Sequence, residues 1–544
     1  MAKLGSQRHA RNAENLVGME SHMQKLYKML QVGYGGGTEN IEGISLKVTN
    51  TEEVNVIRTA FMQMTRLRFL KLEKAYICQG PDFLPGELRW LDWHRYPSKS
   101  LPIGFQGELL VGLKLKNSRI IQLWKGSKVL WNLKYINLSH SQKLIGTPDF
   151  SGTPNLERLV LEECTSLVEI KFSVTDLGKL VLLNLKNCRN LKTLPKSIQL
   201  ESLEVLILSG CLKLKTFPDI KEKMNRLSEL YLEATALREL PASVENLSGV
   251  SLINLSYCKN LENLPSNICR LKCLRTLALS GCSRLEKLSD DVGLLVVLEE
   301  LHCDGTAIER IPSSISLLKN LKHLSFRGCN ALSLQVGSSI FSSWFSGKGQ
   351  NSMGLTISNL SSLCSLTTLD ISHCNISDGG TLCILGCLSS LVELNLSGNN
   401  FNNIPAASIS GLTRLICLEL VGCRLLVNIP ELPQCIEEVH VDECTSLESI
   451  DQLVKYPMLR RVYSGQCSYH AADDSIDERL LKINNQALTA SIRPMTRSKK
   501  KELQDKLIAL MDQAQDISVN SIFAALDQRF PSGLRIKPRG NIFQ

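Results

Sequence analysis

Leucine and other aliphatic residues recur at fixed offsets along most of the chain. The repeated unit is LxxLxLxx(C/N/T)xxL, as in LERLVLEECTSL from Leu156 and LEVLILSGCLKL from Leu203. Seventeen units follow one another at spacings of 21 to 25 residues, with one spacing of 45. Their first residues are Leu67, Leu88, Leu110, Leu133, Leu156, Leu180, Leu203, Leu227, Val250, Leu274, Leu298, Leu321, Leu366, Leu391, Leu415, Ile436 and Leu459. Because strand side chains alternate between two faces, each LxL segment predicts a short strand with its leucines inward.

A small residue stands eight positions after the first leucine of most units. It follows the predicted strand, where buried backbone polar groups of the turn need partners. The residues at this position are Cys164, Cys188, Cys211, Cys258, Cys282, Cys329, Cys374, Cys423, Cys444 and Cys467, with Thr235, Thr306 and Asn399 in other units. Several units continue with a Leu-Pro or Ile-Pro pair, as at Leu240-Pro241, so we expect turn-like or extended returns rather than long helices.

A self-similar period of this size predicts a leucine-rich-repeat solenoid. The expected fold class is an α/β repeat with a curved, parallel β-sheet horseshoe and short flanking segments. We expect a lead of residues 1–40 with a helical pattern at 15–31, a lead into the repeats at 41–66, and the solenoid at 67–467. We expect a Ser- and Gly-rich insertion at residues 333–365. We expect a polar, largely disordered tail at residues 468–544, with one helix at 499–514.

The positions of the cysteines and the net charge indicate which cellular compartment and which kinds of binding partner to expect. Ten of the 19 cysteines share one position of the repeat, so we expect reduced, structural thiols, with disulfide or metal roles as the alternative. No apolar leader and no run of 18 apolar residues occurs. A net charge of +9, spread along the chain, does not indicate nucleic-acid binding. We expect a cytoplasmic protein, with a nuclear location as the alternative.

Several segments resemble plant intracellular immune receptors that combine a TIR domain, a nucleotide-binding domain and leucine-rich repeats. ENLVGMESHMQKLYKML is similar to the start of that family's nucleotide-binding domain, and GTENIEGISLKV and LPGELRWLDWHRYPSKSLP resemble its passage into the repeats. GTAIERIPSSI and the SSWFSGKGQNSMGL insertion are also typical of it. The resemblance implies a role in plant defence through recognition of a pathogen effector or of a guarded host protein. A full-length receptor of the same family is a further expected partner.

The chain departs from the family pattern in three places. It has no counterpart of the TIR domain, and residues 1–40 resemble only the start of the nucleotide-binding domain. No GxxxxGK(S/T) loop is present to cradle phosphates. The tail segment SIRPMTRSKKKELQDKLIALMDQ resembles junctions in plant retroelement polyproteins, or is a basic nuclear-localisation patch. We therefore expect a truncated recognition module without a cofactor; a nucleotide-dependent switch and a non-immune scaffold or adaptor are the alternatives.

No spaced set of residues indicates catalysis, cofactor binding or a metal. The histidines form no motif with Cys, Ser or carboxylates; His302 and His323, on adjacent units, are expected to be exposed strand residues. The sequence predicts a non-enzymatic protein that binds another protein through its concave strand face, with neither a membrane nor a nucleic acid as partner. Tyr and Arg are enriched at such interfaces, although a merely solvated face is the alternative. The candidate residues are Tyr135, Arg158, Glu162, Lys186, Tyr231, Glu233, Tyr257, His302, Asp304 and Arg327.

Overall fold

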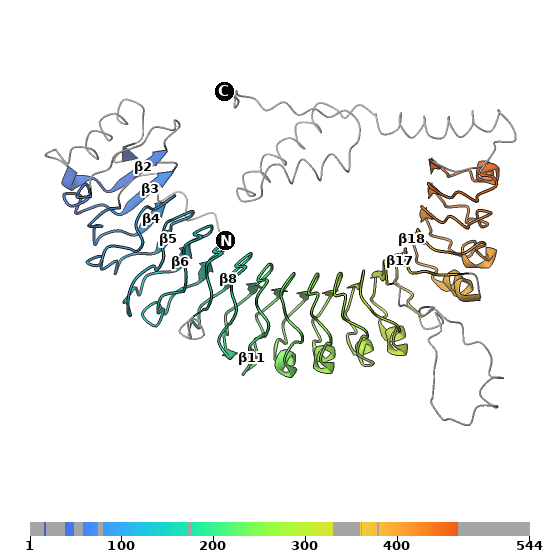
Figure 1. Ribbon diagram of the computed structural model, residues 1–544, viewed down its shortest axis with the longest axis horizontal. Helices are drawn as coiled ribbons and strands as arrows, with labels where there is room; N and C mark the ends of the chain where they lie inside the picture. Colours follow the sequence, from blue (N-terminus) through green and yellow to red (C-terminus); the bar gives the residue numbers. More distant parts are fainter. Residues whose placement is uncertain are drawn as a thin grey trace. The chain divides into compact units, whose positions relative to one another are not determined.

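The repeats stack their strands into one continuous parallel sheet. In the computed structural model, the described residues are 16–17, 38–47, 58–73, 80–170, 177–329, 360, 362–377 and 380–465. The sheet has 19 strands, and each pairs in parallel with the one that follows it in the sheet (Figure 1). They are β1 (Leu16–Val17), β2 (Gly43–Lys47), β3 (Phe69–Glu73), β4 (Trp90–Trp93), β5 (Gly112–Lys114), β6 (Tyr135–Asn137), β7 (Arg158–Val160), β8 (Leu182–Asn184), β10 (Val205–Ile207), β12 (Glu229–Tyr231), β13 (Leu252–Asn254), β14 (Thr276–Ala278), β15 (Glu300–His302), β16 (His323–Ser325), β17 (Thr368–Asp370), β18 (Glu393–Asn395), β19 (Cys417–Glu419), β20 (Glu438–His440) and β21 (Arg461–Tyr463).

The strand positions confirm the repeat pattern. Each strand from β3 to β21 in the sheet begins two residues after the first leucine or its substitute in one of the seventeen units. The sheet also includes β2, whose Gly43 pairs with Phe69, and β1, whose Leu16 pairs with Gly43. The helical pattern expected at 15–31 is therefore wrong at its start, because Leu16–Val17 pairs along the edge of the sheet; the rest of that segment lies outside the described residues.

The inward residues of each unit form a continuous apolar core. In the unit that begins with the buried Leu203, the side chains of Leu206, Leu208 and Leu214 are at most 3% exposed. Full burial of one such side chain stabilises the fold by about 1.5–3 kcal/mol. Because every unit repeats this arrangement, the core extends along the solenoid instead of forming one central mass.

A left-handed residue ends the strand segment of fifteen consecutive units, seven positions after the first leucine. Glycine accepts a positive φ without steric cost, whereas other residues pay for it. These residues are Arg95, Asn117, His140, Glu163, Asn187, Gly210, Ala234, Tyr257, Gly281, Gly305, Gly328, His373, Gly398, Gly422 and Glu443, all with φ between 54° and 76°. The turn places the next residue, at position eight, beneath the sheet.

The thiols at position eight connect neighbouring units. The Sγ atom of Cys188 donates to the carbonyl of Leu161 at 3.1 Å, and the Sγ atom of Cys211 donates to Leu185 at 3.3 Å. The other described cysteines of this column make the same bond to the preceding unit, while Cys467 lies outside the described residues. None of the cysteine side chains that the structure describes forms a disulfide bond. Burial raises the pKa of Cys164, Cys211 and Cys282 to about 12, so these thiols stay protonated at neutral pH.

The returns on the other side of the solenoid are short 3-10 helices and extended segments, as the proline positions predict (Figure 1). Pro241, Pro265 and Pro312 each stand directly before such a helix. The helices are η2 (Thr38–Asn40), η4 (Ala242–Asn246), η5 (Ser266–Arg270), η6 (Val292–Leu294), η7 (Ser313–Leu317), η9 (Gly380–Cys387), η10 (Ala406–Ser408) and η11 (Asp451–Lys455). Two further strands, β9 (Ser197–Ile198) and β11 (Asp219–Ile220), pair with each other in a small second sheet.

The sheet continues across the predicted insertion. His323 of β16 pairs directly with Thr368 of β17, although residues 330–359 between them lie outside the described residues. The chain divides into two units, Met1–Asp477 and Glu478–Gln544, and all described residues belong to the first. The helix expected at 499–514 therefore also lies outside the described residues.

Candidate protein-binding surface

The solvent-facing side of the sheet carries the candidate residues. We call this surface the strand face; it consists of positions two, four and six after the first leucine of each unit. β14 shows the alternation, with Leu277 buried and Thr276 and Ala278 half-buried on the strand face. Parallel pairing aligns equal positions of adjacent units, as between Leu252 and Thr276, so each position forms a column across the sheet.

Nine of the ten candidate residues lie on the strand face between β6 and β16. The exception is Tyr257, which was expected on the strand face but occupies the left-handed turn position after β13, with 62% of its surface exposed. The exposed candidates are Arg158, Lys186, Tyr257 and Arg327, and the half-buried ones are Tyr135, Glu162, Tyr231, Glu233, His302 and Asp304.

Asn137 and Ser139 stand at positions four and six of their unit, which belong to the strand face, but they are buried at 5% and 2% exposure. The Oδ1 atom of Asn137 accepts bonds from the backbone N–H of Ser139 at 2.9 Å and from its hydroxyl at 2.7 Å. Its Nδ2 atom donates to the hydroxyl of Tyr135 at 2.9 Å. The asparagine therefore closes the end of its strand, a role that Asn184 repeats at the backbone N–H of Lys186.

Two of the candidate carboxylates bind the units on both sides of them. Glu233 and Asp304 occupy position six in two different units, and each accepts side-chain hydrogen bonds from the preceding and the following unit. The donors are Ser209 and Asn254 for Glu233, and Ser280 and Ser325 for Asp304. These carboxylates therefore hold three units in register, a role that no motif within one unit indicates.

An aromatic pair lies where the strand face crosses β4, β5 and β6. The rings of Trp90 and Tyr135 stack with centroids 6.0 Å apart and planes 5° apart. Gly112 lies between them in register, and a Cβ atom there would come within 2.1 Å of the Trp90 ring. The sequence predicts Tyr135 as a candidate but misses Trp90, because the stack depends on a glycine one unit away.

Other candidates form short-range pairs on their own strand. The hydroxyl of Tyr231 donates to Glu229 at 2.9 Å, and burial together with this bond raises the pKa of Tyr231 to about 12. The Nε2 atom of His302 lies 3.6 Å from a carboxylate oxygen of Glu300. His302 and His323, which were expected to be exposed, are half-buried; the register partner of His323 is Glu300, so the two histidines lie diagonally across β15 and β16.

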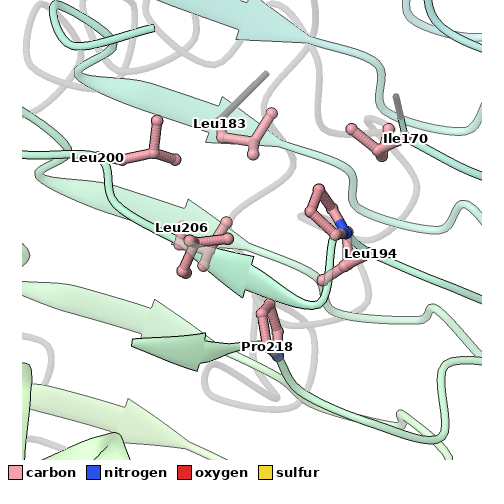
Figure 2. A pocket seen from close by; sticks show the side chains of 8 residues that line it. Ile170, Leu183, Leu194, Leu200, Leu206 and Pro218 are labelled. Carbon is pink, nitrogen blue, oxygen red and sulfur yellow. The ribbon is translucent and has the colours of Figure 1, made fainter. Parts of the chain in front are cut away.

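The structure also contains a small apolar pocket inside the solenoid (Figure 2). Aliphatic side chains and prolines line it, among them Ile170, Leu183, Leu206 and Pro218. It presents no group that could act as an acid, a base or a metal ligand, so it is a packing defect and not a candidate active site. Among the described residues, no helix has the length and the apolar character that a membrane crossing requires.

Comparisons with known proteins agree with this architecture. Residues 199–292 match the family described as "Disease resistance protein RPS4B-like, leucine-rich repeats", and residues 364–425 match "Leucine rich repeat". TMV resistance protein N of Nicotiana glutinosa is 37% identical over 405 residues, and the disease resistance-like protein DSC1 of Arabidopsis thaliana is 37% identical over 432 residues. The chain is therefore similar to the leucine-rich-repeat part of plant disease resistance proteins.

These relatives are TIR-NBS-LRR proteins, and the similarity covers the repeat region of this chain. The alignments cover 74% and 76% of this chain but 34% and 33% of the two relatives, so the chain spans about a third of their length. Among solved structures, the Toll–Spätzle complex of Drosophila matches 83% of this chain and 60% of the other, with a TM-score of 0.55 and 17% identity. That match shows the leucine-rich-repeat fold, and the homologues support a defence-related repeat module.

Proposed function

We propose that the strand face between β6 and β16 binds a protein partner in plant defence. The observation that carries this proposal is the exposure of Arg158, Lys186 and Arg327 on the strand face, with Tyr257 exposed at the turn after β13. Arg and Tyr side chains are common hot spots of protein interfaces, and a stacked sheet presents them without a large cost of ordering.

The internal contacts separate two groups among the candidates. Glu233 and Asp304 hold neighbouring units together, and Tyr231 bonds to Glu229, so changing any of them would perturb the sheet itself. Arg158 and Arg327 are exposed, and their removal takes no volume from the core. We therefore place the main binding contributions on Arg158 and Arg327.

The partner we propose is a pathogen effector or a host protein that such an effector modifies. This follows from the homology with resistance proteins, and a full-length receptor of the same family is a further partner under the same proposal. The free thiols of the described cysteines agree with a reducing compartment, so we place the protein in the cytoplasm, with the nucleus as the alternative.

The test compares two double variants of the full chain against a partner isolated by pull-down. Arg158→Ala with Arg327→Ala removes two cations from the strand face. Arg238→Ala with Arg310→Ala removes two exposed cations outside it and serves as the control, because both variants change the net charge equally. We expect the first variant to lose at least about 2 kcal/mol, roughly thirtyfold in affinity. The control variant should bind like the unchanged protein.

Equal affinity of the two variants would reject these arginines as hot spots. Binding by a fragment of residues 468–544 alone would reject the strand face as the binding surface. Micromolar binding of ADP, or of ATP with Mg²⁺, measured by isothermal titration, would instead favour the nucleotide-dependent switch.

A further inference from the structure

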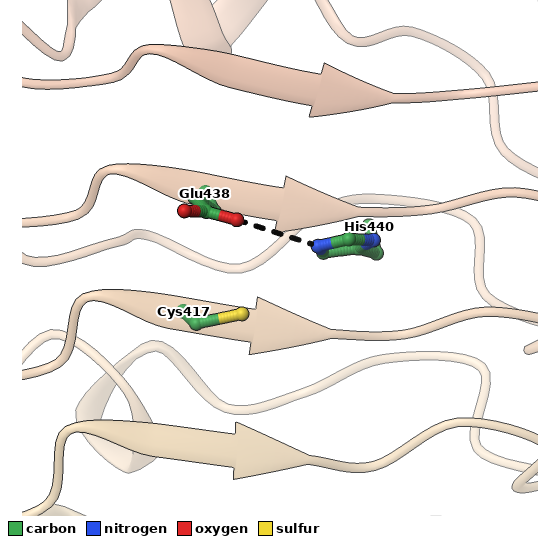
Figure 3. Close-up of side chains that lie close together, drawn as sticks. All are labelled: Cys417, Glu438 and His440. Atoms are coloured by element: carbon green, nitrogen blue, oxygen red, sulfur yellow. Dashed lines mark ion pairs between the residues drawn. The ribbon is translucent and has the colours of Figure 1, made fainter. Parts of the chain in front are cut away.

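Three side chains with metal-binding atoms meet on the strand face near the C-terminal end of the sheet (Figure 3). Cys417 is the first residue of β19, and Glu438 and His440 are the first and third residues of β20. The Sγ atom, a carboxylate oxygen and an imidazole nitrogen all lie within 4.8 Å of one another. Among the described residues, this is the only group of three His, Cys, Asp or Glu side chains that meets this distance.

The register of the sheet produces this convergence. Cys417 and Glu438 are direct partners in the parallel pairing of β19 and β20, so their side chains leave the sheet side by side. His440 lies two residues after Glu438 and therefore projects from the same face. Its Nε2 atom is 3.9 Å from the Glu438 carboxylate. The three ligands thus come from two adjacent strands of a rigid sheet and not from a flexible loop.

The imidazole of His440 has a defined orientation. Its ring stacks on Tyr463 of β21, with centroids 4.3 Å apart and planes 14° apart. Burial lowers the pKa of His440, although Glu419 and Asp442 act in the opposite direction. The stacked ring and the position of His440 on β20 keep an imidazole nitrogen directed at the Cys417 and Glu438 side chains.

The charge around the cluster favours a cation. Glu393 and Glu419 act electrostatically on Cys417, and Glu419 and Asp442 act on His440, so three carboxylates outside the cluster oppose the nearby cation Arg461. Metal binding releases the proton of the Cys417 thiol, because the thiolate is the form that binds a metal. A thiol loses its proton readily to a metal that binds sulfur strongly.

We propose that Cys417, Glu438 and His440 bind a zinc ion, with the fourth position open to water or to a group from a bound partner. A sulfur, nitrogen and oxygen ligand set suits Zn²⁺, and three protein ligands with one open position is a known arrangement for it. Zinc bonds of about 2.0–2.3 Å place tetrahedral ligand atoms roughly 3.3–3.8 Å apart, so small side-chain rotations complete the site.

Arg461 of β21 competes with the metal for Glu438. Its guanidinium forms an ion pair with the Glu438 carboxylate, the side chain that would also ligate zinc. Zinc binding therefore has to displace this arginine or share the second carboxylate oxygen with it. Removing the arginine should tighten zinc binding, because it releases the Glu438 carboxylate and takes away a positive charge beside Cys417.

The experiment uses the full chain after treatment with a chelator. Zn²⁺ affinity is measured by competition with a chromogenic chelator, and Co²⁺ is added separately to follow the thiolate-to-cobalt charge-transfer absorption. The test variants are Cys417→Ser, His440→Gln and Arg461→Gln. One control, His302→Gln, changes the equivalent Glu-x-His arrangement of β15, where Thr276 stands at the position that corresponds to Cys417. The other control, Cys273→Ser, removes an exposed thiol elsewhere.

We expect one zinc ion per chain, with at least about tenfold weaker binding in Cys417→Ser and in His440→Gln. The cobalt charge-transfer band should vanish in Cys417→Ser, and both controls should bind like the unchanged protein. Arg461→Gln should bind zinc several-fold more tightly. Circular dichroism checks that each variant keeps its fold.

Three results would overturn the site. One is zinc binding by the unchanged chain no tighter than millimolar. Another is that Cys417→Ser and His440→Gln bind zinc as tightly as the two control variants do, which would place the metal elsewhere. A third is unchanged or weaker binding in Arg461→Gln, which would remove Glu438 from the ligand set.

Discussion

Among the described residues at position eight, Asn399 makes the largest number of side-chain hydrogen bonds. We predict that replacing it lowers the free energy of unfolding more than replacing any other residue at this position. The side chain is 1% exposed. Its Oδ1 atom accepts from the backbone N–H groups of Cys374 and Ile376, both at 3.1 Å. Its Nδ2 atom donates to the carbonyls of Ile371 at 3.0 Å and Leu396 at 2.7 Å. One amide therefore satisfies four backbone groups in two neighbouring units.

The bond counts set the expected magnitudes. Asn399→Ala removes four bonds; the N–H groups of Cys374 and Ile376 and the carbonyl of Ile371 lose this partner, while the carbonyl of Leu396 keeps the thiol of Cys423. At about 0.5–1.5 kcal/mol net per bond, the free energy of unfolding should fall by about 4 kcal/mol. Cys282 occupies the same position in another unit but donates only one bond, to the carbonyl of Leu255 at 3.2 Å. Cys282→Ala should cost only about 1–2 kcal/mol, for one weak bond and a small loss of packing.

Urea unfolding followed by circular dichroism measures both values on the full chain. Asn399→Cys is an informative third variant, since a thiol there can donate one bond, as Cys423 does to Leu396. Its stability should lie between those of Asn399→Ala and the unchanged protein. If Asn399→Ala and Cys282→Ala lose the same free energy, the argument from the number of satisfied backbone groups is refuted.

Two further predictions concern the thiols and the left-handed turns. Iodoacetamide should label the exposed Cys273, Cys364 and Cys387 of the native protein rapidly. The buried thiols at position eight should react only after denaturation, because burial raises their pKa. Mass spectrometry measures the labelling, and rapid labelling of Cys211 or Cys282 in the native protein would contradict the prediction. Ala234→Gly should stabilise the protein by about 1 kcal/mol, because Ala234 has a φ of 54° that glycine adopts more easily. The control Ala278→Gly, in the extended strand β14, should destabilise the protein by about 0.5–1 kcal/mol. Shifts of the urea unfolding midpoint in the opposite directions would refute the interpretation.

The sheet itself was predictable because its information is local. Each unit carries its own leucines at fixed offsets, and a strand begins two residues after the first of them in every case. The position-eight column was also predictable, since Cys188, Cys211 and Asn399 recur at one offset and the turn there requires a polar partner. The structural roles of candidates such as Glu233 and Asp304 were not predictable in the same way. Their hydrogen-bond partners belong to other units, and the sequence of one unit does not show which side chains of the adjacent units lie beside its own.

The amino-acid sequence alone therefore determined the repeat fold and the place of each strand, because periodic hydrophobicity acts within single units; particular segments carried the resemblance to disease resistance proteins. Only the tertiary structure decided what neighbouring units do together. It stacked Trp90 on Tyr135 across Gly112, and it brought Cys417 beside Glu438 and His440. The physical reason is the parallel register: equal positions of successive units become direct neighbours about 4.8 Å apart across the sheet, and a glycine such as Gly112 lets side chains two units apart meet.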